Sequence, residues 1–257
     1  MTGEVEFDRI APIYDETRRP PTDEELQVLG ELWGACTTIL DAGVGTGRFA
    51  APLASRGFDV VGVDLSLEMM RRARSKGVPS LLRADVCRLP LSDGSVDAGF
   101  MAHVLQLLPD PRVPLRELAR AARNSVVVQL PDRSDPTRVD ERRVIGERYR
   151  ELAAELGHPL PPRGPRRWHT LEELRAIARP RRVRTLLGPP GLRTEGTDRF
   201  GGGWITHQYG RIPVPPEVHE RIVERIRAEH PGAPEQVAGP RRQHFVEWDP
   251  AELRASR

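Results

Sequence analysis

The 257-residue sequence has little of several residue types that mark particular classes of protein. Aromatic residues make up 5% of the chain, only two cysteines are present, and Lys76 is the only lysine. The formal net charge is only +2, because 39 basic residues nearly balance 37 acidic ones. The arginines are spread along the chain, whereas a nucleic-acid surface needs basic residues gathered on one face. We therefore do not expect a nucleic-acid substrate.

The two cysteines, Cys36 and Cys87, are too few for a disulfide framework and do not have metal-ligand spacing. They suit a reducing compartment, as small buried apolar side chains. No apolar run approaches the roughly 20 residues that a spanning helix needs. The acidic first residues, 1–8, also lack the basic-then-apolar layout of a signal peptide. We expect a cytoplasmic protein without a membrane partner or a metal, as a monomer or a homodimer.

Short apolar runs alternate with helix-like stretches between residues 38 and 130. The predicted strands are 38–41, 58–64, 80–85, 96–102 and 124–130. The predicted helices are 48–55, 67–74 with Ser66 as N-cap, and a helix through Ala122 with Pro111 at its first position. Strands that are apolar on both faces and separated by helices favour a parallel sheet covered on both sides. Right-handed crossovers make such an α/β sheet doubly wound.

The pattern loosens after Leu130. We predict helices over 139–156 and 216–230, and a short helix that opens at a capping box, Thr170-Leu-Glu-Glu173. Two further strands are predicted over 182–187 and 243–248.

The strongest local signal is Asp41-Ala-Gly-Val-Gly-Thr-Gly47, which joins the first strand to a helix. Glycines let the backbone turn sharply and let a ligand lie against it, and the helix N-terminus offers free N–H groups. A dinucleotide fingerprint has the spacing G-x-G-x-x-G, whereas this loop has G-x-G-x-G. A pyrophosphate is also disfavoured beside Asp41, whose charge suits a ligand with a sulfonium and an ammonium group.

Two more carboxylates end the next predicted strands. Asp64 lies about twenty residues on, where an acidic side chain can accept both ribose hydroxyls of an adenosine. Asp85 can accept from an adenine amino group while Val86 packs on the ring. Each aspartate alone is also consistent with a turn or a helix cap. In a doubly wound sheet, ligands lie at the carboxyl ends of the strands, where these residues and Ala102-His103 fall.

These motifs together resemble the class I S-adenosylmethionine-dependent methyltransferases, in the branch that includes the ubiquinone/menaquinone biosynthesis methyltransferases. The resemblance rests on Phe7-Asp-Arg-Ile-Ala-Pro-Ile-Tyr14-Asp15, the glycine loop, Val61-Gly-Val-Asp64-Leu-Ser, Arg83-Ala-Asp85-Val-Cys-Arg-Leu-Pro90-Leu and Phe100-Met-Ala-His103-Val-Leu-Gln-Leu-Leu-Pro-Asp. It implies a Rossmann-like, mostly parallel seven-stranded sheet with an antiparallel last strand and a helical insertion near the C-terminus. We expect one domain, with an N-terminal helical lid (1–36), a cofactor-binding core (37–130) and a substrate-side region (131–257).

The resemblance also implies S-adenosylmethionine as cofactor and a small-molecule acceptor. The implied cofactor-binding residues are Tyr14, Arg19, Asp41, Gly43, Gly45, Thr46, Gly47, Asp64, Leu65, Met69, Asp85, Val86, Ala102 and His103. Val44 departs from many relatives, which carry cysteine there, at a position where the backbone faces the ligand.

Methyl transfer needs alignment of donor and acceptor and exclusion of water, and a general base only when the nucleophile arrives protonated. His103 and Tyr14 are the candidate catalytic groups, although a structural role for His103 and packing of Tyr14 on the cofactor are open alternatives. His169 and His207 are weaker candidates. The competing functions are a nicotinamide-dependent oxidoreductase, a non-catalytic S-adenosylmethionine-binding protein and an RNA or protein methyltransferase.

Overall fold

The computed structural model describes residues 7–8, 11–12, 14–15, 19–132, 141–160, 169–187, 214–229 and 242–256. Seven strands form one sheet in the order β3-β2-β1-β4-β5-β7-β6. The strands are β1 (Thr38–Ala42), β2 (Asp59–Asp64), β3 (Ser80–Arg83), β4 (Val96–Ala102), β5 (Ala122–Pro131), β6 (Arg182–Leu187) and β7 (Arg242–Trp248). Neighbouring strands are parallel except where β7 pairs with β5 and β6. The predicted doubly wound sheet with an antiparallel last strand is confirmed.

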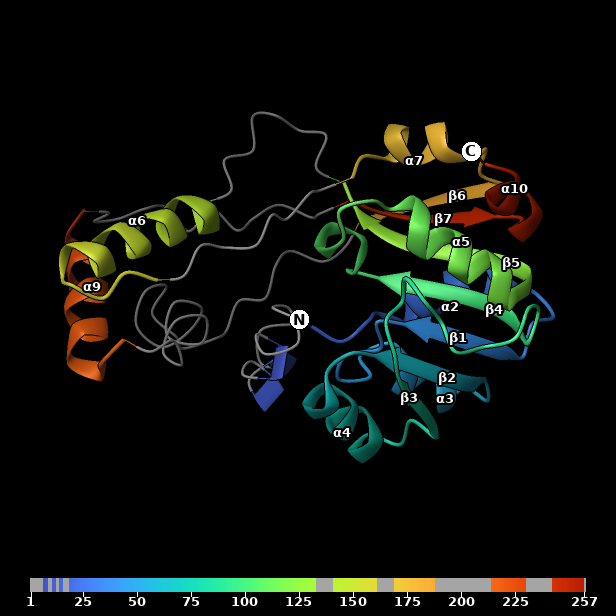
Figure 1. Cartoon of the computed structure of the whole chain (residues 1–257), viewed down its shortest axis with the longest axis horizontal. Coiled ribbons are helices and arrows are strands. Elements are labelled where there is room, and N and C mark those ends of the chain that lie inside the picture. The colour runs from blue at the N-terminus through green and yellow to red at the C-terminus, as the bar shows by residue number, and fades with distance from the viewer. Residues whose placement is uncertain are drawn as a thin grey trace.

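Helices cover both faces of this sheet (Figure 1). The described helices are α2 (Asp23–Trp33), α3 (Ala50–Ala54), α4 (Leu67–Ser75), α5 (Arg112–Ala121), α6 (Glu141–Glu155), α7 (Leu171–Ile177), α9 (Pro216–Glu229) and α10 (Pro250–Ala255), with a 3-10 turn, η2 (Leu105–Leu107); all but α6 and α9 lie against the sheet. One buried cluster contains apolar side chains of α5, α7 and α10, and another contains those of α2, α3 and α4.

The central strands are apolar on both faces, which is why the sequence reads as continuous apolar runs there. Ile39 and Leu40 are neighbours in β1, yet they belong to opposite clusters, as do Phe245 and Val246 in β7. Because successive side chains of a strand point to opposite faces, each central strand contributes to both cores. The two clusters together hold the sheet between the helical layers.

The edge strands differ from this pattern. Most residues of β3 and β6 are exposed or half-buried, because each strand has a neighbour on one side only. The predicted third strand extended to Asp85, but β3 ends at Arg83 and Asp85 lies in the turn that follows. Two helix starts also differ from prediction. α3 begins at Ala50 instead of Arg48, and Pro111 is the N-cap of α5 rather than its first residue.

Side-chain caps fix several of the helix starts. The Ser66 hydroxyl accepts from the N–H of Met69, and Thr170 and Glu173 form the predicted capping box of α7. Thr22 and Glu25 form a second capping box that starts α2, a helix not identified individually from the sequence. α10 was also missed; it begins after Asp249, whose side chain accepts from the N–H of Ala251.

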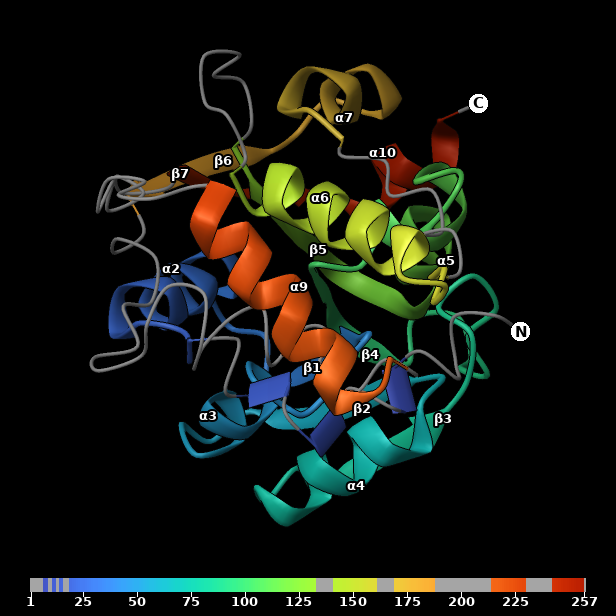
Figure 2. The same ribbon diagram turned by 90° about the vertical axis from the view of Figure 1, so that its left-hand side faces the viewer.

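Helices α6 and α9 form a separate pair with a small core of its own. They lie side by side beyond the carboxyl ends of the parallel strands, away from the helices that cover the sheet (Figures 1 and 2). Their shared cluster includes Tyr149, Leu152 and Ile222, all fully buried. The Tyr149 hydroxyl lies 2.7 Å from Nδ1 of His219, which joins the two helices by a polar contact. Of this pair, α9 lies between β6 and β7, where the helical insertion was predicted, whereas α6 precedes β6.

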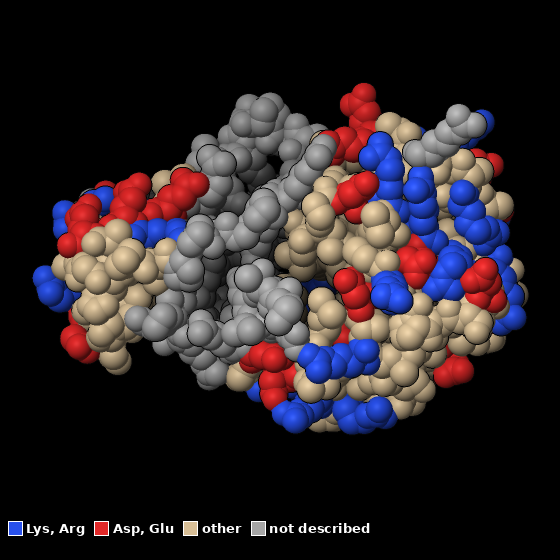
Figure 3. All heavy atoms as spheres, in the orientation of Figure 1, with Lys and Arg blue, Asp and Glu red and all other residues tan. Residues whose placement is uncertain are grey.

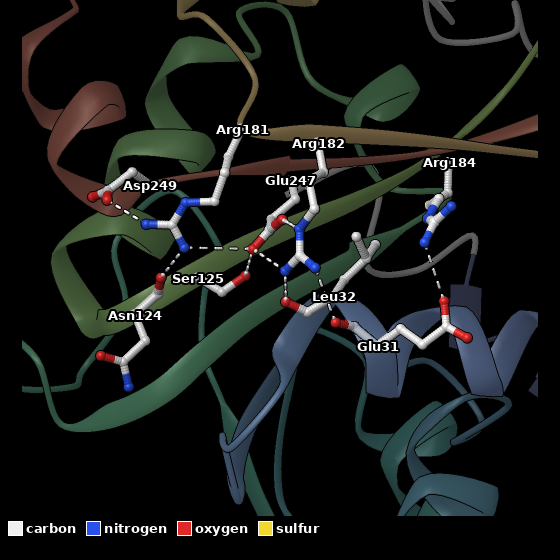
Figure 4. Close-up of polar contacts among 9 residues, drawn as sticks. All are labelled: Glu31, Leu32, Asn124, Ser125, Arg181, Arg182, Arg184, Glu247 and Asp249. Atoms are coloured by element: carbon white, nitrogen blue, oxygen red, sulfur yellow. Dashed lines mark hydrogen bonds and ion pairs between the residues drawn. The ribbon is translucent and has the colours of Figure 1, made fainter.

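A buried ion cluster holds the amino ends of β6 and β5 together (Figure 4). Glu247 of β7 is fully buried, and its carboxylate accepts two hydrogen bonds from Arg182, of 2.5 and 3.1 Å. Ser125 donates to the same carboxylate, and Arg181 forms an ion pair with it at 3.6 Å. Arg182 also donates to the carbonyls of Glu31 and Leu32 in the last turn of α2. The cluster therefore ties the sheet edge to the end of a helix.

No helix in the described part of the chain combines the length and the apolar character that a bilayer-spanning segment needs. Cys36 is buried and Cys87 half-buried, and both are free thiols. Trp248 is fully buried in the core, in agreement with a structural role. Trp168, the Gly201-Gly-Gly203 segment, Trp204 and His207 lie outside the described residues.

Candidate functional site

The strand order reverses between β1 and β4, and the glycine loop starts at this point. The N–H groups of Gly43 and Val44 both donate to the carbonyl of Val63 in β2, at 2.7 and 2.9 Å. Gly43 has a φ of +83°, which side chains strongly disfavour. A Cβ at this residue would also lie 2.2 Å from Cγ2 of Val104. Gly43 is therefore required by the packing of the loop on the segment after β4.

The other two glycines of the loop have different surroundings. A Cβ on Gly47 would lie 3.1 Å from the Cα of Ala73, so Gly47 allows α4 to approach the loop. A Cβ on Gly45 would meet no protein atom within 4 Å, although its φ is +54°. Among the three, Gly45 is the one whose backbone faces open space. The sequence argument assigned the same ligand-facing role to all three glycines.

Asp41 lies in β1 immediately before this loop. Only 3% of the residue is exposed, and no hydrogen bond or ion pair joins its carboxyl to another described residue. Burial raises its pKa to about 7, the positive charge of Arg48 opposes that shift, and Asp64 adds to it. A cation placed next to this carboxyl would lower its pKa and favour the charged form. The carboxyl of Asp41 is thus suited to pair with a positively charged ligand.

Asp64 ends β2 and holds the loop by its backbone. One carboxylate oxygen accepts from the N–H of Gly45 at 2.8 Å, and the other accepts from the N–H of Ser66 at 2.9 Å. Burial raises the pKa of this carboxyl, and these backbone hydrogen bonds oppose the shift. Each oxygen retains a second lone pair that can accept from a ligand hydroxyl.

A cleft opens between the glycine loop and the residues after β4. It is lined by Tyr14, Asp41, Gly43, Val44, Gly45, Thr46, Arg48, Phe49, Ala102 and His103. The structure thus brings together seven of the predicted site residues from three separate segments. The sequence analysis did not assign Arg48 and Phe49 to the site. They follow Gly47 directly, so their position in the loop was the available signal.

The remaining predicted residues do not line this cleft. Arg19 instead forms two hydrogen bonds with Glu25, of 2.6 and 2.8 Å, and Met69 of α4 is 1% exposed. Leu65 follows Asp64 with 45% of its surface exposed. Asp85 is exposed and accepts from the N–H of Cys87 at 2.8 Å, in the turn geometry that the sequence left open as an alternative. Val86 is 7% exposed and packs in the core.

His103 has the only positive φ of a non-glycine residue in the described part of the chain, +59°. Its carbonyl accepts from the side-chain amide of Gln106 at 2.6 Å, which stabilises this turn out of β4. Non-glycine residues in this conformation are uncommon and cluster at ligand sites. The turn places the backbone and ring of His103 at the cleft, opposite the glycine loop.

The N-terminal segment is attached to the cleft by two carboxylates that the sequence analysis missed. Asp15 accepts from the hydroxyl of Thr46, which is fully buried, and from Nζ of Lys76, both at 2.6 Å. Asp8 accepts from the hydroxyl of Ser66 and from the N–H of Glu68 at the start of α4. These contacts hold Tyr14 beside the glycine loop.

Glu25 and Gln129, each 2% exposed, form a further buried polar contact beside this segment. The Gln129 amide donates to Glu25 at 3.4 Å, and Arg48 donates to the carbonyl of Arg19 at 3.1 Å. Arg19 therefore acts as a link between Glu25 and the glycine loop. In the described part of the chain, no group of His, Cys, Asp and Glu residues has an arrangement that could hold a metal ion.

Comparisons with known proteins agree with this geometry. Residues 40–128 match the family model described as a methyltransferase domain. The matched residues include the glycine loop, the ends of β2 and β4, and the cleft-lining residues on these segments. Residues 40–128 are therefore similar to the class I S-adenosylmethionine-dependent methyltransferase domains.

Individual relatives are similar to part of the chain. A malonyl-[acyl-carrier protein] O-methyltransferase from Hamiltonella defensa is 35% identical over 104 residues, 40% of each chain. A ubiquinone/menaquinone biosynthesis C-methyltransferase from Syntrophotalea carbinolica is 35% identical over 144 residues, 51% of this chain and 61% of the relative. The chain thus spans about half the length of the curated relatives that it matches.

A solved structure extends the likeness of the fold. A putative methyltransferase from an antibiotic biosynthesis pathway of Anabaena variabilis superposes with a TM-score of 0.58. The superposition covers 89% of this chain and 98% of that chain, with 18% sequence identity. At this identity the likeness concerns the fold, including the strands beyond the methyltransferase domain match.

S-adenosylmethionine is the methyl donor expected of a methyltransferase domain, and the cleft together with the neighbouring Asp64 fits that molecule in three respects. The donor carries an ammonium and a sulfonium, and Asp41 is a buried carboxyl without a described polar partner. The donor's bulk needs a backbone that it can approach, and Gly45 faces open space. Its ribose needs acceptors, and both oxygens of Asp64 are held in place by backbone N–H groups.

Proposed function

We propose that this protein transfers the methyl group of S-adenosylmethionine to an O, N or C atom of a small-molecule acceptor. The observation that carries the proposal is the buried carboxyl of Asp41 at the point where the strand order reverses. A carboxyl in that position is unfavourable for the protein alone, because burial opposes its charged form. A cationic ligand removes this disadvantage.

The donor-side roles follow from the contacts around the cleft. Asp41 pairs with the amino-acid end of the donor, and Asp64 accepts the ribose hydroxyls. Leu65 has 45% of its surface exposed next to Asp64, and an adenine ring lying on it would cover that apolar area. Asp85 and Val86 follow β3 and provide an acceptor and an apolar contact for the adenine, while Ala102 and Gly43 supply backbone beside the methionine portion.

The bound donor supplies an electrophilic methyl group on a positively charged sulfur. The protein's contribution is to align this group with an acceptor and to exclude water. Asp15 and Asp8 hold the N-terminal segment over the glycine loop, so Tyr14 closes one side of the cleft. His103 lies at the opposite side and, with Tyr14, is a candidate to take a proton from an acceptor that arrives protonated.

The acceptor is expected beyond the carboxyl ends of the strands, on the side where α6 and α9 lie (Figure 2). The printed names of two relatives specify an O-methyltransferase and a C-methyltransferase, so related domains serve different acceptor atoms. We infer a small molecule as acceptor because the matched relatives include quinone-biosynthesis enzymes. The residues after the domain match, 131–257, decide which molecule it is.

A comparison of ligands tests the donor assignment. We expect S-adenosylhomocysteine to raise the thermal unfolding temperature of the protein, because it binds the folded state alone. NAD should leave that temperature unchanged. Stabilisation by NAD without stabilisation by S-adenosylhomocysteine would instead support a nicotinamide-dependent oxidoreductase.

Activity is tested by incubating the protein with methyl-labelled S-adenosylmethionine and a panel of phenols, amines, carboxylic acids and quinones. Transfer of label to a small molecule supports the proposal. Tight donor binding without transfer across the panel would favour a non-catalytic binding protein. Label in bulk RNA or protein would show that the acceptor is a macromolecule.

A further inference from the structure

A recess of about 410 Å³ lies between α7 and the start of β6, away from the cofactor cleft. It is lined by Arg175, Arg179, Pro180, Arg181, Arg182 and Val183. β6 runs parallel to β1, so the start of β6 lies at the amino edge of the sheet, whereas Asp41 lies at the carboxyl edge. The recess is therefore separate from the methyltransferase site, and the inference does not depend on the proposed function.

The four arginines differ in how many of their guanidinium N–H groups are still able to donate a hydrogen bond to a ligand. Arg182 donates to both oxygens of Glu247 and to two carbonyls of α2, which occupies four of its five N–H groups. Arg181 makes two hydrogen bonds, to the carbonyl of Asn124 and to Asp249, which leaves three N–H groups (Figure 4). Arg182 is thus held in place by its hydrogen bonds, whereas Arg181 can still donate to a ligand.

The side chains of Arg175 and Arg179 are exposed to solvent. Within the described ranges, no hydrogen bond or ion pair joins either guanidinium to another residue. The carboxylates of Glu247 and Asp249 are already paired with Arg181 and Arg182. The recess therefore carries the positive charge of two arginines that no described carboxylate offsets, beside a third guanidinium with N–H groups to spare.

This arrangement suits a phosphate group on a small organic body. Guanidinium forks match the oxygens of a phosphate in pairs, and three of them can share one dianion. A volume of about 410 Å³ is larger than one phosphate needs and is in the range of small-ligand sites. Pro180 and Val183 add apolar surface for the rest of the molecule. On the face seen in Figure 3, basic and acidic side chains are interspersed.

We propose that the recess formed by Arg175, Arg179 and Arg181 binds a phosphorylated small molecule. The phosphate contacts the three guanidinium groups, and the organic part lies against Pro180 and Val183. The ion cluster of Glu247 with Arg181 and Arg182 keeps the base of the recess in place before any ligand binds.

Calorimetric titration of the full-length protein tests this site, with S-adenosylhomocysteine present in excess to occupy the cofactor cleft. The probes are ribose 5-phosphate, inorganic phosphate and ribose. We expect ribose 5-phosphate to bind more tightly than inorganic phosphate, ribose to give no binding heat, and added salt to weaken the phosphorylated ligands. If S-adenosylhomocysteine itself fails to bind, the cofactor proposal fails while this titration can still be interpreted.

Two double variants complete the test. R175Q/R179Q should weaken ribose 5-phosphate at least about tenfold, with an unchanged unfolding temperature because neither side chain has a described partner. R88Q/R221Q removes two other exposed arginines and should bind like the wild type. Equal binding by both variants, or binding of ribose as tight as that of its phosphate, would overturn the proposal. A short RNA that displaces ribose 5-phosphate and needs the same two arginines would overturn the assignment to a small molecule.

Discussion

The two edges of the sheet each contain a buried carboxyl group, and the two groups differ in whether other side chains pair with them. At the amino edge, Glu247 is fully buried and is held by Arg181, Arg182 and Ser125 (Figure 4). At the carboxyl edge, Asp41 is 3% exposed and has no hydrogen bond or ion pair in the described part of the chain. Glu247 pairs with arginines of the protein itself, whereas Asp41 remains available to a cationic ligand.

The comparison explains how one sheet serves both stability and binding. The hydrogen bond to Glu247 raises the pKa of Arg182, a guanidinium that is charged at accessible pH in any case. Burial is the largest cause of the rise in the pKa of Asp41 to about 7, so its charge depends on pH and on the ligand. We infer that structural and ligand-binding carboxylates in this fold differ in whether the chain supplies their counter-charge.

The largest effect is expected from Glu247→Ala. This change leaves the guanidiniums of Arg181 and Arg182 without their buried partner, and we expect a loss of about 3–5 kcal/mol in the free energy of unfolding. Urea denaturation measures it, and Glu247→Gln, which keeps the shape, should cost less. The affinity of the folded protein for S-adenosylhomocysteine should not change. A loss below about 1 kcal/mol would show that the cluster is not structural.

Asp41→Asn should lower the affinity for the ligand without lowering stability, which is the opposite of Glu247→Ala. Because the amide cannot neutralise an ammonium, we expect the affinity for S-adenosylhomocysteine to fall about tenfold to a hundredfold. The free energy of unfolding at pH 8 should stay the same or rise, since a buried charge is removed. Isothermal titration measures the affinity, and Asp59→Asn, an exposed carboxylate at the start of β2, is the matched control. Equal affinities in the two variants would remove Asp41 from the site.

The pH dependence of both quantities separates the two edges further. An acid whose pKa is raised from 3.8 to about 7 on folding contributes stability at low pH, and this contribution is lost as pH rises through about 7. The affinity for S-adenosylhomocysteine should rise about tenfold between roughly pH 6 and pH 8, because the charged carboxylate binds the ammonium. Asp41→Asn should flatten both profiles, which thermal unfolding and titration can follow. An unchanged pH profile in that variant would contradict the assignment.

A smaller loss of stability than that of Glu247→Ala is expected from Gly45→Ala. The added Cβ meets no protein atom, so the cost is the positive φ alone, about 1 kcal/mol. The affinity for S-adenosylhomocysteine should fall, because the methyl group occupies space next to the ligand. Gly43→Ala, whose Cβ would clash with Val104, should lose more stability. If Gly45→Ala keeps the wild-type affinity, the donor does not lie against this residue.

The parts of the fold that local sequence patterns determine were predicted well. The bounds of β4 and β6 agree with the predicted ranges, and Ser66 and Thr170 cap the helices as expected. Apolar runs indicate central strands because both faces are buried, and side-chain caps act over three residues. The cleft residues on the glycine loop and after β4 were also predicted, because the loop and the strand end are local motifs.

The remaining errors concern contacts between distant segments. Asp15 meets Lys76 across 61 residues, and Asp8 meets Ser66 across 58, so no local pattern marks either pair. Arg19 was predicted to face the ligand, but it pairs with Glu25, a residue that also caps α2. Asp85 was placed at a strand end, although the exposed edge strand stops two residues earlier. For Asp8, Asp15 and Arg19, a partner outside the local sequence pattern determined the contacts.

The central claim is that Asp41 is a buried carboxyl awaiting a cationic ligand. Carbon-13 NMR of the aspartate carboxyl groups, with Asp41→Asn to assign the signal, measures its pKa in the free protein and with S-adenosylmethionine bound. We predict a pKa of about 7 in the free protein and a decrease of more than about one unit on binding. A pKa that does not change when the ligand binds would contradict the account.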